Sequence, residues 1–269
     1  MAIQAGRGKI SVFEDFNGIG AAFTLTDATA GNRYNDICMV AISGDVAADY
    51  TVDESGGVIN FSGAAGAGDG VAIFASPMIP ASNGTMTTFG RAKVSSAADY
   101  RFFAGFQQTV SLSETVNPYT LSGTTLTANA AGEVVGFYYD TQATTDDFRF
   151  MAGSNSAAST SAALSYALGG ATTLGSLGVR CNATLTADRW FNWKVEIDAD
   201  GTARGFFGDA TMANANGLTH IATLKAGDLS TTVAYFPIVQ LLEQSTGDPT
   251  HELDYFGATG YRTWAAATP

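Results

Sequence analysis

The amino-acid sequence predicts an all-β protein, a two-sheet antiparallel sandwich of the jelly-roll kind. Segments in which apolar and polar residues alternate recur along the 269 residues, as expected for strands with one buried and one wet face. Charged residues make up only 14% of the chain, which disfavours charged, solvent-facing helices. The 17 Phe, 10 Tyr and 3 Trp residues are enough to fill an extended core between two sheets.

The clearest strand covers residues 191–198, and its polar positions would face water. Its apolar side chains occupy every second position, at Phe191, Trp193, Val195 and Ile197. This alternation assigns Trp193 to the core. The pair Asp200-Gly201 is a strong turn signal, and residues 202–207 follow as a second strand. We therefore expect a β-hairpin here.

Further strands are expected along the rest of the chain. They cover residues 71–74, 87–94, 100–106, 132–139, 147–151 and 233–242. The pattern predicts a second hairpin in which residues 87–94 pair with residues 100–106 across the turn at 95–99. Several of the other strands are apolar on both faces, as central strands covered by a loop or a neighbouring subunit would be.

The segments between these strands predict long loops rather than linkers, so we expect a single domain over residues 1–269. The loops are rich in small residues and lie near residues 62–70, 122–132 and 152–178. The segment 161–168 is the best match to a helical period, and it ends at Gly169-Gly170. We expect at most one short helix.

Charge and composition exclude several classes of partner. The formal net charge of -12 repels a phosphate backbone, so nucleic acid is not an expected partner. No segment approaches the ~18 apolar residues of a membrane span, and residues 1–9 lack the apolar core of a signal peptide. We therefore expect a non-secreted protein without a membrane partner. Cys38 and Cys181 are too few for a disulfide framework and predict buried thiols.

Residues 189–201 resemble a motif of concanavalin A-like and laminin G-like jelly rolls, in which an aromatic-led strand ends in an acidic-Gly turn. Residues 9–17 and 251–256 resemble the opening and closing strands of those domains. The resemblance implies that the two terminal strands lie side by side in one sheet. The adjacent Asp and Asn ligands that sugar-binding members use for calcium and manganese have no match in this sequence. With its many Ala, Gly and Thr residues and no catalytic signature, the chain also resembles virion proteins of tailed bacteriophages.

The carboxylates of Glu196, Asp198 and Asp200 are the best candidates for catalysis, because such a series could act as nucleophile, helper and acid in a glycosidase. Asp200 should leave the strand face at the turn, and the simpler interpretation is a solvated face. Neither His220 nor His251 lies in a catalytic or metal-binding motif, and His251 is expected at an edge of the closing strand. We therefore predict no catalytic, cofactor-binding or metal-binding residues.

Two other kinds of site stay open in the sequence. The acidic turns at 198–201 and 246–248 could hold a calcium ion, although they lack the ligand series of an EF-hand. Trp190 and Trp264 could stack on sugars as the aromatic residues of carbohydrate-binding modules do.

Taken together, these patterns predict a non-enzymatic structural protein of a bacteriophage virion that decorates or cements the capsid. Its partners would be the major capsid or another virion protein and further copies of itself, and it would need no cofactor. The alternative is a carbohydrate-binding module or host-receptor adhesin with a glycan as its partner. A glycosidase that uses Glu196 and Asp198 is the third hypothesis.

Overall fold

The computed structural model of the chain is built almost wholly from β-strands. It describes residues 9–16, 22–25, 32–34, 36–42, 44–50, 57–63, 68–80, 84–96, 98, 100–108, 119–122, 125–128, 132–141, 148–155, 179–181, 183, 185–209, 217–224, 229–243 and 250–261. Among these residues, no helix has the length and apolar character needed to cross a membrane.

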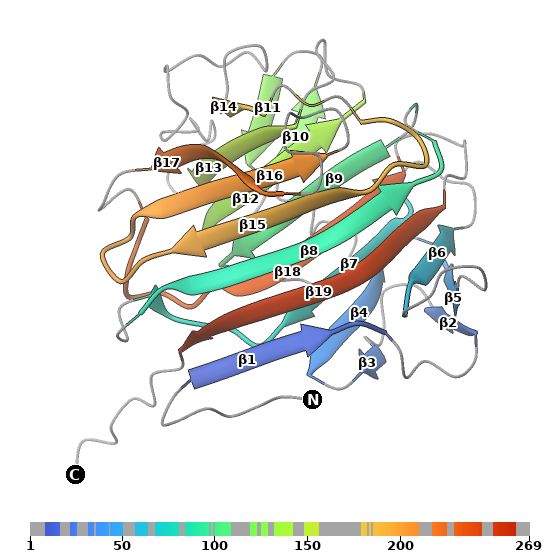
Figure 1. Cartoon of the computed structure of the whole chain (residues 1–269), viewed down its shortest axis with the longest axis horizontal. Helices are drawn as coiled ribbons and strands as arrows, with labels where there is room; N and C mark the ends of the chain where they lie inside the picture. The colour runs from blue at the N-terminus through green and yellow to red at the C-terminus, as the bar shows by residue number, and fades with distance from the viewer. Residues whose placement is uncertain are drawn as a thin grey trace.

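Nine strands form the first sheet, here called sheet A, which faces the viewer in Figure 1. In spatial order they are β17 (Thr219–Leu224), β16 (Ala203–Asp209), β15 (Phe191–Ile197), β8 (Met86–Val94), β19 (His251–Tyr261), β6 (Ile59–Gly63), β5 (Val46–Tyr50) and β2 (Phe23–Leu25), with β1 (Lys9–Glu14) beside β19. All pairs are antiparallel. The pairing of β1 with β19 places the two terminal strands side by side, as the sequence predicts.

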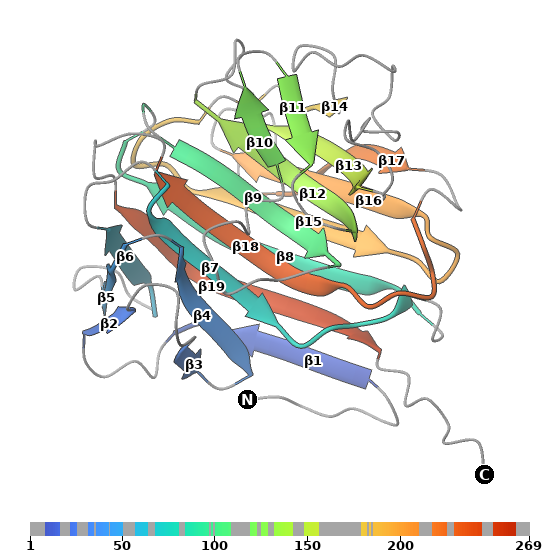
Figure 2. The same ribbon diagram turned by 180° about the vertical axis from the view of Figure 1, so that it is seen from behind.

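Eight strands form the second sheet, sheet B, which lies in front in Figure 2. In spatial order they are β14 (Val179–Arg180), β13 (Arg149–Asn155), β12 (Gly132–Asp140), β9 (Tyr100–Gln107), β18 (Phe236–Glu243), β7 (Gly70–Ala75), β4 (Ile37–Ile42) and β3 (Asn32–Tyr34). A separate hairpin joins β10 (Tyr119–Ser122) to β11 (Thr125–Ala128) and lies over β12 and β13 in Figure 2.

The core between the two sheets is dense in aromatic rings. Trp193 of β15 is fully buried, as predicted, and its ring centroid lies 5.4 Å from that of Phe102 on β9. Phe102 also meets Phe191 edge to face at 5.0 Å, while Phe148 and Phe207 are 4.5 Å apart. These contacts join strands of both sheets, so aromatic packing across the sandwich fastens sheet A to sheet B.

The predicted hairpin around Asp200-Gly201 is confirmed. β15 pairs with β16 from Ile197 opposite Ala203 to Phe191 opposite Asp209. The turn needs a positive backbone angle at Gly201, whose φ is 83°, and the Asp200 carboxylate accepts a hydrogen bond from the Thr202 amide. Outward side chains of β15 alternate with buried ones. This strand therefore has the one wet face that the sequence indicates.

The second predicted hairpin is wrong, because β8 and β9 lie in different sheets. β8 pairs with β15 and β19 in sheet A, whereas β9 pairs with β12 and β18 in sheet B. The burial patterns explain this division. β8 alternates buried and half-buried residues and so suits a sheet with one wet face, but β9 is buried on both faces apart from Arg101. The chain between them crosses from one sheet to the other.

The strands predicted to be apolar on both faces all belong to sheet B. In β9, Phe102 and Phe106 point into the core between the sheets, and Phe103 on the opposite face is still only 1% exposed. The same holds for Val134 of β12 and Ile238 of β18, which are buried outside that core. These positions on the outer face of sheet B are thus buried within one chain, whereas Phe74 of β7 on the same face is only half-buried.

All three predicted loops contain strand residues. Ser62 and Gly63 complete β6, and Gly70 begins β7. The expected loop at 122–132 contains β11 and the end of β10, because two short polar segments with little apolar alternation still pair as a hairpin. In the third loop, residues 152–155 complete β13, and residues 156–178, including the candidate helix at 161–168, lie outside the described residues.

Candidate functional site

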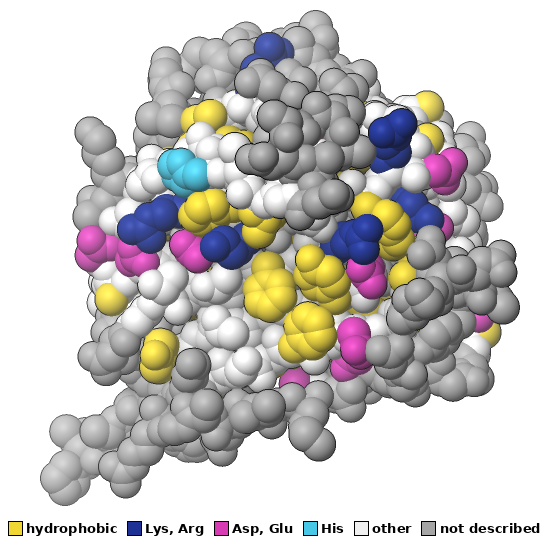
Figure 3. All heavy atoms as spheres, viewed as in Figure 1, with side chains coloured by type: hydrophobic (Ala, Val, Ile, Leu, Met, Phe, Trp, Pro, Cys, Tyr) yellow, Lys and Arg dark blue, Asp and Glu magenta, His cyan; other side chains and the backbone are white. Residues whose placement is uncertain are grey.

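Three aromatic rings lie together on the outer face of sheet A. They belong to Phe13 of β1, Phe89 of β8 and Tyr255 of β19, and we call them the aromatic face. The ring of Phe13 has its centroid 6.3 Å from that of Phe89 and 5.9 Å from that of Tyr255, and the last two are 6.2 Å apart. Phe13 is 48% exposed. Figure 3 shows a group of hydrophobic side chains near the centre of this side of the molecule.

Strand register brings the three rings together from distant parts of the chain. Gly257 of β19 lies between Phe13 on one side and Phe89 on the other. Gly257 has no side chain, so the Phe89 ring lies across it, and a Cβ at this position would be only 2.4 Å from that ring. The glycine therefore lets the Phe89 ring lie low over β19 and approach Phe13.

A β-bulge in β19 places a polar group beside these rings. The register shifts between Leu253 and Tyr255, so that Asp254 and Tyr255 together lie opposite Arg91 of β8. Asp254 accepts a hydrogen bond from Arg91 at 2.9 Å in a half-exposed ion pair. Burial, and to a lesser extent the Asp254 charge, raise the pKa of Tyr255, while Arg91 lowers it. The phenol is therefore a neutral donor at neutral pH.

Trp190, left open as a sugar-stacking residue, is covered by cations. The Arg91 guanidinium lies 4.6 Å and the Lys93 ammonium 4.8 Å from the centroid of its ring. Each of these cations also pairs with a carboxylate, Arg91 with Asp254 and Lys93 with Glu252, at 2.9 Å in both cases. Trp264, the other candidate, lies outside the described residues.

The carboxylates proposed for a glycosidase are held in ion pairs. Lys194 lies 3.0 Å from Glu196, and Arg204 lies 2.5 Å from Asp198. The hydrogen bond from Arg204 holds the pKa of Asp198 below its ordinary value, with a smaller contribution from Thr85. A general acid at neutral pH needs a raised pKa instead. Asp200 lies in the exposed turn and leaves the strand face, as predicted.

The two histidines lie in opposite environments. His220 on β17 is exposed and has its Nε2 atom 2.9 Å from the Thr223 hydroxyl. His251 begins β19, and instead of lying at an accessible edge it is only 1% exposed because β19 runs through the middle of sheet A. Within the described part of the chain, no three His, Cys, Asp or Glu side chains gather closely enough to hold a metal ion. The acidic segment 246–248 lies outside that part.

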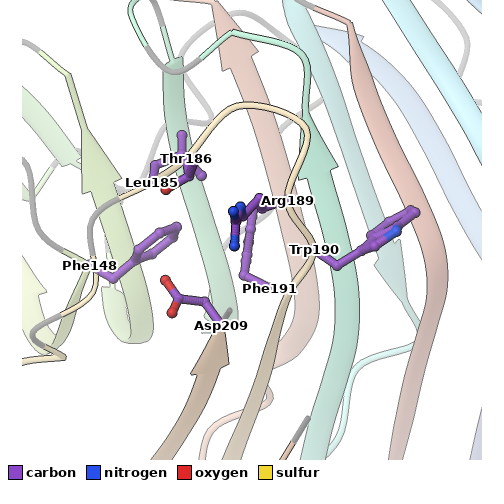
Figure 4. Close-up of a pocket in the computed structure, with 7 residues that line it drawn as sticks. All are labelled: Phe148, Leu185, Thr186, Arg189, Trp190, Phe191 and Asp209. Carbon is purple, nitrogen blue, oxygen red and sulfur yellow. The ribbon is translucent and has the colours of Figure 1, made fainter. Parts of the chain in front are cut away.

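Neither cysteine forms a disulfide. Cys181 is buried, as predicted, whereas Cys38 of β4 is only half-buried because it lies near one edge of sheet B. A small open pocket lies where β15 begins (Figure 4). Its lining residues are Phe148, Leu185, Thr186, Arg189, Trp190, Phe191 and Asp209. The pocket has room for roughly one water molecule, far less than the roughly 300 Å³ at which ligand clefts usually begin, so we assign it no ligand.

Sequence reasoning missed the aromatic face because it considered only tryptophans as exposed stacking residues. One signal was available. In β8, the residues Thr87, Phe89, Arg91 and Lys93 share one face, so Phe89 occupies a position in an otherwise polar series. A large aromatic ring in the wet register of a strand is a candidate contact residue. Its neighbours Phe13 and Tyr255 could not be inferred without the register of β1, β19 and β8.

No known protein family matches the sequence, and no curated protein is similar to it at the level of sequence. Similar folds occur among solved structures. Peanut lectin, crystallised with a nine-residue peptide, is 13% identical with a TM-score of 0.51, and the match covers 89% of this chain and 96% of the lectin. A protein of unknown function from Shewanella oneidensis MR-1 is 12% identical with a TM-score of 0.51, over 97% of this chain and 90% of that protein. The fold is therefore a concanavalin A-like jelly-roll sandwich, as the sequence predicts.

Proposed function

We propose that this chain is a non-enzymatic carbohydrate-binding domain and that its binding surface is the aromatic face. The observation that carries the proposal is the contiguous group formed by Phe13, Phe89 and Tyr255 on the wet side of sheet A. Isolated exposed aromatic residues need no explanation, but a contiguous apolar group with a polar rim is typical of a contact surface. Here the rim is the ion pair of Arg91 and Asp254.

A sugar ring suits such a surface chemically. Its C–H groups form an apolar face that can pack on an aromatic ring, and its hydroxyl groups project around the edge. The Phe13 and Phe89 rings are inclined by only 24° to each other and can support one such face. Arg91 supplies donors and Asp254 supplies acceptors at the edge of the rings. Both kinds of contact are therefore available within one small area.

The absence of catalysis is part of the proposal. The aromatic face contains no carboxylate pair in the arrangement of a glycosidase, and the earlier candidates Glu196 and Asp198 are neutralised by Lys194 and Arg204. Similarity to peanut lectin at 13% identity supports the fold alone. The ligand class is inferred from the rings and their rim.

A glycan array with the purified chain tests the proposal. We expect saturable binding to at least one glycan, and we expect Phe13→Ala and Tyr255→Ala to weaken it while the melting temperature changes little. The matched control is Phe74→Ala, because Phe74 is a half-buried ring on the outer face of sheet B, opposite the aromatic face. Absence of saturable binding to every glycan, or equal loss with Phe74→Ala, would overturn the proposal.

A place in a bacteriophage virion, with a capsid protein or another copy as partner, stays a separate prediction from the sequence. One of its motivations is weakened, because Phe103, Val134 and Ile238 on the outer face of sheet B are buried within one chain. A virion-mounted adhesin would unite this role with glycan binding. Mass spectrometry of purified particles tests the location: the protein should be present in intact virions, and its restriction to the soluble lysate would refute a virion role.

A further inference from the structure

The aromatic face belongs to a longer row that crosses sheet A at right angles to its strands. Successive cross-strand neighbours form this row: Phe13, Gly257, Phe89, Lys194, Phe206 and His220. Five steps between neighbouring strands at ~4.8 Å each make the row roughly 24 Å long. A row of this length can accommodate several sugar rings, whereas Phe13 and Phe89, with Tyr255 beside them, occupy only one end of it.

The other end of the row has a second aromatic group under a cation. Phe206 of β16 meets His220 of β17 edge to face, with 5.3 Å between ring centroids. The Lys194 ammonium lies 4.1 Å from the centroid of the Phe206 ring and 3.0 Å from Glu196. Lys194 is partly exposed and has a flexible stem, so it can leave the ring and keep its charge in water. The Phe206 ring is thus a contact surface that becomes accessible when the Lys194 side chain moves away.

Charges beside the row are balanced. Ion pairs on this side of sheet A join Arg91 to Asp254, Lys93 to Glu252, Lys194 to Glu196, and Arg204 to both Asp198 and Glu196. No cation in this group is left without an acidic partner to attract an anionic ligand. A charged polysaccharide would have to break one of these pairs, whereas a neutral one can exchange hydrogen bonds with their edges.

The ligand could instead extend along the strands towards Trp190, but that ring is less accessible than the ring of Phe206. Two cations cover the Trp190 ring. The pair of Arg91 with Asp254 is 37% and 24% exposed, but the pair of Lys93 with Glu252, at 14% and 13%, is less exposed than the pair of Lys194 with Glu196, at 29% and 20%. Exposed ion pairs contribute little and open easily, while less exposed ones resist opening. The structure therefore favours extension over Lys194 to Phe206.

We propose that the ligand is a neutral, linear β-1,4-linked oligosaccharide with equatorial hydroxyl groups, and that it lies across the strands from Phe13 to Phe206. Such a chain presents flat apolar faces to a row of rings and its hydroxyl groups to the rows on either side. Binding of the far end displaces Lys194 from Phe206. This inference rests on the proposed carbohydrate binding and adds the ligand class and its course over the sheet.

Calorimetric titration with cellobiose and cellohexaose tests the course. The wild type should bind cellohexaose more tightly. Phe206→Ala should weaken cellohexaose binding by roughly two- to tenfold, the value of one aromatic contact, and leave cellobiose binding unchanged. Trp190→Ala is the matched control and should change neither. Lys194→Ala should strengthen cellohexaose binding, because it uncovers the Phe206 ring.

The outcomes separate the two proposals. Any of three results would overturn the course across the strands and leave carbohydrate binding in place. These are equal affinity for the two sugars, a loss of cellohexaose affinity in Trp190→Ala but not in Phe206→Ala, and weaker binding of cellohexaose by Lys194→Ala than by the wild type. Binding of other array glycans without either cello-oligosaccharide would overturn the ligand class alone. A dimer that Phe13→Ala converts to a monomer in light scattering, with no glycan bound, would assign the face to self-association and overturn both.

Discussion

His251 should make the protein sensitive to acid, and its surroundings give the size of the effect. The imidazole is 1% exposed, its centroid lies 5.3 Å from that of the Tyr100 ring, and neither of its nitrogens has a hydrogen-bond partner among the described residues. Burial lowers the pKa of His251 from 6.5 to about 3. The facing Tyr100 has a pKa raised well above its ordinary value, chiefly by burial, so it stays neutral in acid.

The sign of the effect follows from proton uptake. Below pH 6.5 the unfolded chain protonates His251, whereas the folded chain does so only near the lowered pKa of about 3. The free energy of unfolding therefore falls by ~1.4 kcal/mol per pH unit in this window, or about 3 kcal/mol at about pH 4.5. Above pH 6.5 both states carry the neutral ring and the effect vanishes. A loss of this size is a large part of the ~5–15 kcal/mol that stabilises a typical domain.

His251→Phe removes the proton-binding group and keeps a ring against Tyr100. Urea denaturation, followed by the fluorescence of buried Trp193, should give similar free energies of unfolding for variant and wild type at about pH 7.5, and about 3 kcal/mol more for the variant at about pH 4.5. His220→Phe serves as the control, because His220 is exposed, and should show no such gain. If the difference between His251→Phe and wild type is the same at both pH values, the reasoning about His251 fails.

Three further predictions concern sheet A. Gly257→Ala should displace the Phe89 ring, which would lie 2.4 Å from the new Cβ; we expect weaker glycan binding on the array with a small change in melting temperature, and unchanged binding would count against the role of this glycine. Gly90→Ala would bring a Cβ within 2.3 Å of the buried Trp193 ring and 2.8 Å of the Tyr255 carbonyl oxygen. It should lower the free energy of unfolding in urea by about 1–3 kcal/mol, and an unchanged value would contradict the packing seen here. Asp198→Asn breaks a partly exposed ion pair with Arg204 and should cost less than ~1 kcal/mol, with glycoside hydrolysis at background before and after; measurable hydrolysis that this change removes would reinstate the glycosidase hypothesis.

Local patterns were sufficient for most strands and insufficient for their partners. The alternation at 191–198 predicted β15, its buried Trp193 and its hairpin with β16, because a one-sided strand and a tight turn are properties of adjacent residues. The short segment between β8 and β9 looked equally like a hairpin turn. It crosses between sheets because the two strands differ in how many of their faces are buried.

The sequence by itself determined the class of the fold, the wet and dry faces of its strands and the position of Trp193 in the core, since period-two alternation can be read from one segment at a time. The tertiary structure decided which solvent-facing side chains of different strands lie next to one another. The three residues Phe13, Phe89 and Tyr255 are far apart in the chain. Their rings are in contact only because of the register of β1, β19 and β8, the bulge at Asp254 and the missing side chain at Gly257. Strand pairing is non-local, so a surface built across strands exists only after the sheet has formed.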